Sequence, residues 1–109
     1  MPFYDLNDAE TQEMPGRNRK LVVGENLMMV FVERREARPH DHVHENEQML
    51  YFLEGKAMCR LGDEEREIGP GQVVHVPSGL NHHLQPLTPT IRYIGVYSPP
   101  REAVIKGEA

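Results

Sequence analysis

The chain has little cysteine, no long apolar segment and no excess of basic residues. Its 109 residues include a single cysteine, Cys59, so no disulfide can form within the chain. No run of roughly 18 or more apolar residues is present, which argues against a membrane-spanning helix. Acidic residues outnumber basic ones by 17 to 12, and no Lys/Arg cluster indicates a nucleic-acid interface. We therefore expect a protein that binds neither membranes nor nucleic acids.

No secretory signal is visible at the N-terminus. The first residues, MPFYDLNDAE (1–10), are acidic and lack the basic segment and apolar stretch that a signal peptide contains. Together with the scarcity of cysteine, this predicts a reducing, cytoplasmic location. The length predicts one domain, and the hydrophobic fraction of 39% is ordinary for a soluble globular protein.

Short apolar runs, separated by turns rich in Gly and Pro, fill most of the chain. No window repeats apolar residues at the helical period over three turns. Runs of this length, recurring about every 8–12 residues, predict an all-β barrel or sandwich. The expected strands are residues 20–24, 26–33, 48–53, 56–61, 72–76, 83–87 and 90–97. Residues 1–18 are expected to form an arm, 19–98 the barrel and 99–109 a tail with one short helical turn.

The run QMLYFL (48–53) is apolar at both even and odd positions. Alternate side chains of a strand point to opposite faces, so Gln48 shares its face with Leu50 and Phe52. The other face carries Met49 and Tyr51 and is apolar too. We therefore expect this strand to be covered on both sides, by a second sheet or a partner subunit. A homodimer is expected on this ground.

Three histidines and one glutamine have the spacing of a metal site. His42, His44 and Gln48 all have even numbers, so one extended segment can direct them to one point. His82 comes from a second segment, after a Gly/Pro-rich turn. Neutral imidazole nitrogens and an amide oxygen are normal ligands of a divalent first-row metal. Glu47 would replace Gln48 only if the strand bulged at residues 45–46, and the four groups could also line a barrel without metal.

The same residues fall within two motifs that resemble those of the cupin superfamily. The first motif is HxH, a short spacer, Glu or Gln, six residues and Gly, and it matches residues 42–55. The second is Gly, five residues, Pro-x-Gly, two residues, His, three residues and Asn. It matches residues 71–86, except that Pro86 stands in place of Asn. The two motifs occur in the expected order and at the expected separation.

This resemblance implies a fold and a cofactor. The fold would be a double-stranded β-helix, also called a jelly-roll barrel. The cofactor would be one divalent transition metal (Mn, Fe, Ni, Co or Zn), bound by His42, His44, Gln48 and His82. Four neutral ligands leave the ion its full charge, which favours an oxygen-rich, anionic ligand.

Within the superfamily the chain is similar to small pectin-degradation cupins that linearise unsaturated uronates. The similar segments are residues 26–33, 39–48 and 95–102. The last of these carries a catalytic Asp, an aromatic residue and an Arg in those enzymes. Here Tyr97 and Arg101 occupy the aromatic and Arg positions, and we expect both to bind substrate, Arg101 by gripping a carboxylate. Gly95 occupies the Asp position and cannot act as an acid or base.

The predicted function is that of a metal-dependent enzyme acting on a small oxygenated metabolite such as a sugar acid. Isomerase, lyase or ring-opening chemistry would fit such a site. Two alternatives stay open, a metal-dependent dioxygenase or oxidoreductase and a non-catalytic module that binds a metal or small ligand. The general acid or base is not assigned, and the candidates are Glu47, Tyr51, His75 and Tyr97. His83 is expected to point away from His82.

Overall fold

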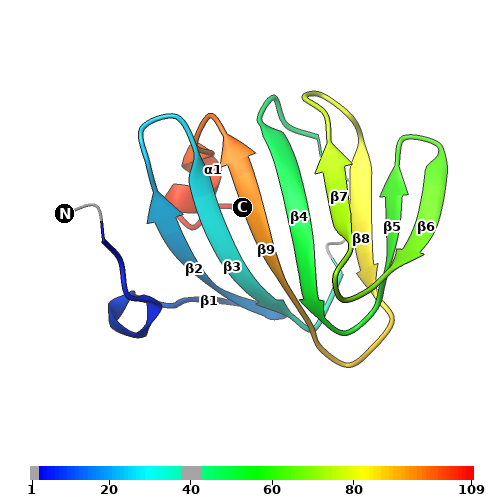
Figure 1. The fold of residues 1–109 in the computed structure, drawn as a ribbon, viewed down its shortest axis with the longest axis horizontal. Coiled ribbons are helices and arrows are strands. Elements are labelled where there is room, and N and C mark those ends of the chain that lie inside the picture. Colours follow the sequence, from blue (N-terminus) through cyan, green and yellow to red (C-terminus); the bar gives the residue numbers. More distant parts are fainter. Residues whose placement is uncertain (1–2, 38–42) are drawn as a thin grey trace.

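The computed structural model describes residues 3–37 and 43–109 (Figure 1). Within these residues the chain forms antiparallel strands, one short 3₁₀ segment and one short helix. The strands are β1 (Gln12–Met14), β2 (Arg17–Val23), β3 (Met28–Arg34), β4 (Glu47–Glu54), β5 (Ala57–Leu61), β6 (Glu64–Ile68), β7 (Val73–Val76), β8 (His82–Pro86) and β9 (Ile91–Ser98). The helical segments are η1 (Leu6–Asp8) and α1 (Glu102–Ile105).

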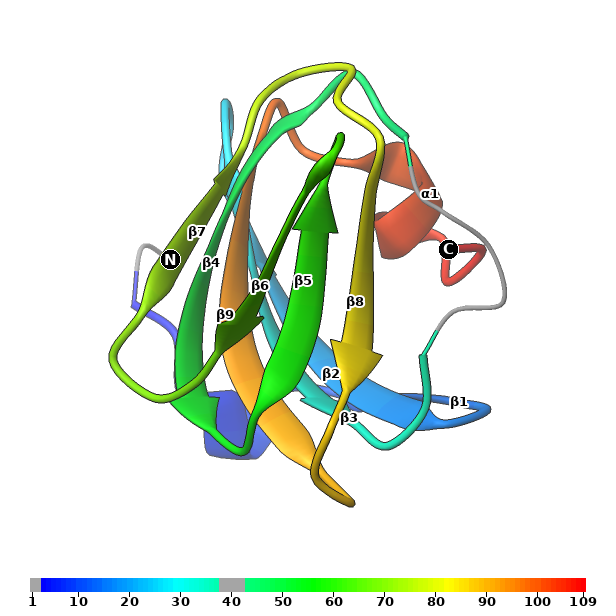
Figure 2. The same cartoon turned by 90° about the vertical axis from the view of Figure 1, so that its right-hand side faces the viewer.

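Two sheets face each other around the core. The larger sheet has six strands in the order β1-β2-β3-β9-β4-β7, and the smaller has three in the order β6-β5-β8. Figure 2 shows the smaller sheet in front of the larger one. This arrangement confirms the predicted all-β, jelly-roll fold.

Side chains alternate between the core and the surface along the main strands. In β3, β4 and β9 every second residue is buried over most of the strand. The core comprises Met28, Val30, Val32, Leu50, Phe52, Ala57, Cys59, Ile68, Val74, Val76, Ile91, Tyr93, Tyr97 and Val104. Burial raises the pKa of the Cys59 thiol to about 11, so this residue is a protonated core side chain at neutral pH.

Two strands were not anticipated from the sequence. β6 has the sequence EEREI and exposes four of its five side chains, so it carries no apolar alternation. It is an edge strand, held by its pairing with β5. β1 and the start of β2 lie inside the segment that was expected to be an arm, and β1 pairs with β2 across the turn at Gly16. In both cases backbone pairing, rather than side-chain burial, defines the strand.

The C-terminal residues form the expected helical turn, and this turn is docked on the sheet. Val104 of α1 is buried. The carbonyl oxygen of Val104 accepts hydrogen bonds from Gln12 Nε2 at 3.2 Å and from Arg19 Nη2 at 3.4 Å. A cation at the end of a helix is favourable because it meets the unsatisfied carbonyl groups there. Among the described residues, neither helical segment is long and apolar enough to cross a membrane.

The outer face of β4 departs from expectation. No second sheet covers it within the described residues, and Met49, Tyr51 and Leu53 are 41–50% exposed. The expectation that another sheet of the same chain buries these residues is therefore wrong. The partner-subunit alternative stays a prediction.

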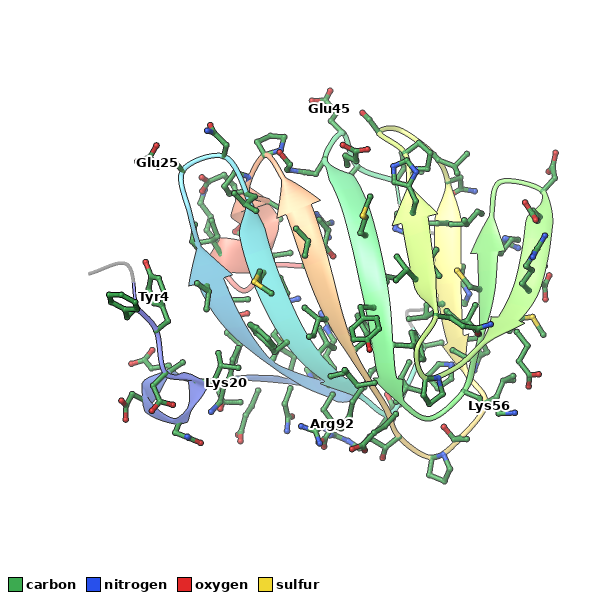
Figure 3. The ribbon with its side chains drawn as sticks, viewed as in Figure 1. Tyr4, Lys20, Glu25, Glu45, Lys56 and Arg92 are labelled. Carbon is green, nitrogen blue, oxygen red and sulfur yellow. The ribbon has the colours of Figure 1, made fainter. Side chains whose placement is uncertain are left out.

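The barrel has two ends, which Figure 3 separates clearly. Glu25 and Glu45 mark what we call the upper end, and Lys56 and Arg92 mark the lower end. At the lower end the turn after β4 packs against the loop before β9. The Leu87 amide donates to the Lys56 carbonyl at 2.8 Å, and the Lys56 amide donates to Thr88 Oγ1 at 3.1 Å.

Gly55 is the residue on which this lower turn depends. Its φ is +80°, and a Cβ there would overlap the carbonyl oxygen of Thr90 and lie 2.9 Å from Ile91 Cγ2. Gly71 has a similar φ of +84°, but a Cβ there would meet no atom within 4 Å.

We therefore predict that Gly55→Ala destabilises the fold much more than Gly71→Ala does. Gly71→Ala should cost roughly 1–2 kcal/mol for the left-handed conformation alone. Gly55→Ala should cost about 2 kcal/mol more, because the backbone oxygen of Thr90 must also shift. Urea unfolding followed by circular dichroism measures both values. Equal costs would show that the Thr90 loop yields and that the contact is unimportant.

Candidate functional site

Gln48 lies inside the barrel near the upper end, as the alternation of β4 predicted. It is 5% exposed, and Leu50 and Phe52 follow it on the same face. Across the sheet, Gln48 is paired with Val76 of β7 and Tyr97 of β9. The chain bends at residues 45–46, just before β4, and Glu47 at the start of the strand is exposed and points outward.

His44 stands just before β4 and is directed toward Gln48. Its Nδ1 lies 2.9 Å from the carbonyl oxygen of Asn46, and its Nε2 lies 3.1 Å from Gln48 Oε1. Burial lowers the pKa of His44 below its ordinary value, and the positive charge of Arg101 lowers it further. The ring is therefore neutral at pH 7.

His82 opens β8 and brings the smaller sheet to the same point. Its ring centroid lies 5.0 Å from that of His44, in an edge-to-face arrangement. The Nδ1 atom of His82 lies 2.9 Å from the carbonyl oxygen of Leu80. A carbonyl can only accept, so Nδ1 carries the hydrogen and the ring lone pair is on Nε2. His42, the remaining predicted ligand, lies outside the described residues.

The hydrogen bond from His44 to Asn46 fixes the tautomer of this ring as well. Its Nδ1–H donates to the Asn46 carbonyl, so in the neutral ring Nε2 carries a lone pair. The neighbouring Gln48 Oε1 also carries lone pairs. The ring nitrogen and the amide oxygen, both of which can bind a metal, therefore lie 3.1 Å apart inside the barrel. A positive ion between or beside them would make this contact favourable.

Tyr97 and Arg101 complete this end of the barrel. The ring of Tyr97 is 5.5 Å from that of His44, and the Arg101 guanidinium carbon is 5.9 Å from the Tyr97 centroid. The backbone amide of Arg101 donates to Met28 Sδ at 3.1 Å, which anchors the residue above β3. Its Nη1 is buried and has no hydrogen-bond partner among the described residues.

Gly95 lies on the inner wall beside these groups. A Cβ at this position would stand 3.7 Å from Gln48 Nε2 and 3.7 Å from the Tyr97 ring. These are ordinary contact distances, so a side chain here would point into the site. The chain places no proton-carrying group at this position.

Most of the other candidate acids and bases face outward. His75 and Glu47 pair on the outer surface, with His75 Nε2 at 2.7 Å from Glu47 Oε2. Tyr51 is 45% exposed on the same surface. Tyr97 is the one of the four candidates that the structure places inside, next to His44. His83 lines an outer groove with Met58 and Arg60, which confirms that it points away from His82.

The described residues contain no group of three His, Cys, Asp or Glu side chains that could hold a metal ion. Two of the predicted ligands, His44 and His82, are of these types and lie close together. The third, Gln48, is an amide. The donor set that converges here is therefore two imidazoles and one amide oxygen, which suits a borderline transition ion.

Comparison with known proteins agrees with this fold. A family model described as the cupin domain matches residues 28–90, so the chain belongs to the cupin family. KdgF from Halomonas sp. superposes with a TM-score of 0.85 and 27% identity, over 95% of this chain and 98% of that one. An RmlC-like cupin from Shewanella frigidimarina gives 0.86 and 21%, over 95% and 96%.

One curated relative also matches. The uncharacterized protein SCO3923 of Streptomyces coelicolor is 30% identical over 57 residues, covering 52% of this chain and 54% of the relative. The chain thus matches about half the length of that relative.

Proposed function

We propose that this cupin is a metal-dependent enzyme acting on a small oxygenated metabolite that bears a carboxylate, such as a sugar acid. The proposed cofactor is one divalent transition ion (Mn, Fe, Ni, Co or Zn) bound by His42, His44, Gln48 and His82. His42 is included on its place in the sequence motif. The redox-neutral reaction classes are isomerisation, lyase chemistry and ring opening.

The observation that carries the metal is the contact between His44 and Gln48. Two atoms bound to one ion at about 2.1 Å each, at a right angle, lie about 3 Å apart. The Nε2–Oε1 distance of 3.1 Å agrees with this geometry. The hydrogen bonds from Nδ1 of His44 and His82 to backbone carbonyls hold both rings in the tautomer that a metal requires.

Arg101 supports the carboxylate part of the proposal. Its buried Nη1 lacks a hydrogen-bond partner among the described residues, and its charge acts on His44. A guanidinium binds a carboxylate through two parallel hydrogen bonds, which would orient the substrate beside His44 and Gln48. A divalent ion bound there would polarise a substrate carbonyl or hydroxyl oxygen.

Tyr97 is the residue best placed to hold a proton at the bound substrate. It packs between His44 and Arg101, and it is buried. Gly95 leaves the adjacent wall without a carboxylate. The proton transfer proposed for this chain therefore differs from that of the uronate-linearising cupins, where an Asp stands at the corresponding position.

We also propose that the protein is a homodimer, formed through the outer apolar face. We define this face as Met29, Met49, Tyr51, Leu53 and Val73, which are all exposed. Strand register brings them together. Tyr51 of β4 is aligned with Val73 of β7. Met49, two positions earlier on β4, is aligned through Val96 of β9 with Met29 of β3. A contiguous apolar surface on a sheet is typical of an interface between copies.

The first prediction from the proposed function concerns the metal. His82→Ala should weaken cobalt(II) or zinc binding by about 100-fold or more, because it removes a ligand rather than a supporting group. The matched control is His83→Ala, which removes the adjacent, outward-facing histidine. Equilibrium dialysis with metal analysis measures both. Equal metal content in the two variants would refute the ligand assignment.

The second prediction concerns substrate binding. Arg101→Gln should lower kcat/KM by roughly 10- to 100-fold on any carboxylate substrate, since a charge-assisted hydrogen bond is lost. Arg92→Gln, which removes an exposed arginine at the lower end, should leave kcat/KM unchanged. The assay is turnover of unsaturated uronates and related keto acids by protein loaded with Mn, Fe, Ni or Zn.

The same set of substrates and metals also distinguishes the reaction classes. Turnover with zinc supports redox-neutral chemistry and excludes an oxidative mechanism. Oxygen uptake that needs a redox-active metal would favour the dioxygenase alternative. Tight ligand retention without product under every metal would favour a binding module, and the enzyme proposal would fail.

The third prediction concerns assembly. Leu53→Glu should convert the dimer to a monomer in sedimentation equilibrium, because it places a charge in the outer apolar face. Leu87→Glu is the control, since Leu87 is also exposed (50%, against 41% for Leu53) but lies in the loop before β9. A wild-type protein that is monomeric at high concentration would contradict the proposal.

A further inference from the structure

A second cluster of cationic side chains lies on the inner face of the larger sheet. Arg17 of β2 is paired across the sheet with Arg34 of β3, and Arg34 is only 6% exposed. Tyr93 of β9 joins them, because its hydroxyl oxygen accepts a hydrogen bond from Arg34 Nε at 3.2 Å. Tyr93 lies four residues before Tyr97 on β9, or ~13 Å along the strand, so the cluster is separate from His44.

No described residue balances the positive charges in this cluster. Arg34 donates to two neutral oxygens, the Tyr93 hydroxyl and, from Nη1 at 3.4 Å, the Glu36 carbonyl. Arg17 Nε is buried and has no hydrogen-bond partner in the part of the chain that the structure describes. Over residues 3–37 and 43–109, neither arginine forms an ion pair with a carboxylate.

Tyr93 adds a further donor. Its oxygen already accepts from Arg34, so its own hydrogen points elsewhere, and no described residue accepts it. The ring is held in place by stacking on Phe52, with centroids 5.6 Å apart and planes 13° apart. Hydrogen-bond donors from β2, β3 and β9 therefore lie together, and no described residue offers them an anionic acceptor.

Such an arrangement is unfavourable unless something satisfies it. Burial lowers the pKa of Arg17, and the adjacent charge of Arg34 lowers it further, so the two cations oppose each other. A buried donor without an acceptor also loses its hydration. Guanidinium groups match the oxygen pairs of carboxylates and phosphates, and a tyrosine hydroxyl donates to either.

We propose that Arg17, Arg34 and Tyr93 form a second binding site, for a small oxyanion such as phosphate or a carboxylate. The bound oxyanion would accept from Arg17 Nε and from the Tyr93 hydroxyl, and it would balance the two guanidinium charges. This site is independent of the proposed metal and of the substrate carboxylate assigned to Arg101.

The test uses metal-free, full-length protein. Its thermal midpoint is measured in sodium phosphate, sodium acetate and sodium chloride at equal ionic strength. A saturable rise of roughly 4 °C or more in phosphate over chloride is expected at tenfold excess over the dissociation constant. The acetate arm decides whether a carboxylate is accepted too. Equal midpoints in phosphate and chloride would mean that water alone satisfies these donors, and would overturn the proposal.

Variants locate the response. Arg17→Gln and Tyr93→Phe should each abolish most of the phosphate-dependent rise, and Tyr93→Phe keeps the test available if Arg17→Gln does not fold. Arg66→Gln is the charge-matched control, because Arg66 is exposed on β6, and it should keep the full rise. A rise that survives in both Arg17→Gln and Tyr93→Phe but disappears in Arg101→Gln would place the anion at the upper end and refute the second site.

Discussion

The alternation of side chains along β4 is the constraint on which both the candidate site and the outer surface depend. β4 lies between β9 and β7 in the larger sheet, so its register fixes which residues of three strands face inward. With Gln48 inside, Glu47 must face solvent, and the apolar residues that follow at odd positions must face outward. A shift of one residue would place the Glu47 carboxylate inside in place of the Gln48 amide and would bury the outer apolar face.

The electrostatics of the interior differ from those of the surface. The chain carries a net charge of −5, yet the buried charged residues that the structure describes are arginines, Arg19 and Arg34. Arg101 adds a partly buried cation near His44. Buried and partly buried arginines inside an acidic protein favour anionic small molecules as ligands. The proposed carboxylate substrate and the proposed oxyanion site at Arg17, Arg34 and Tyr93 both follow from this distribution.

Much of the architecture could be predicted from the sequence, because a strand that is buried on one face has an apolar residue at every second position. The parity of Gln48 and the outward direction of His83 followed from that period alone. The strand β6 could not be found in this way, because four of its five side chains are exposed. His42 remains a prediction, since it lies outside the described residues.

Contacts between strands were beyond the reach of the sequence for a different reason. The His75–Glu47 pair and the Arg17–Arg34 pair depend on cross-strand register, which no local pattern encodes. The hydrogen bonds that set the tautomers of His44 and His82 depend likewise on where the loop carbonyls of Asn46 and Leu80 lie. The ligand types were therefore visible in the sequence, whereas the geometry that makes them suitable was not.

The central claim is that His44, Gln48 and His82 bind one metal ion together. The most direct test is a crystal structure of the cobalt-loaded protein, with an anomalous difference map collected at the cobalt absorption edge. We expect a single strong peak about 2.1 Å from Nε2 of His44, Oε1 of Gln48 and Nε2 of His82. A map without that peak, with the Gln48 amide turned so that its nitrogen donates to His44, would contradict it.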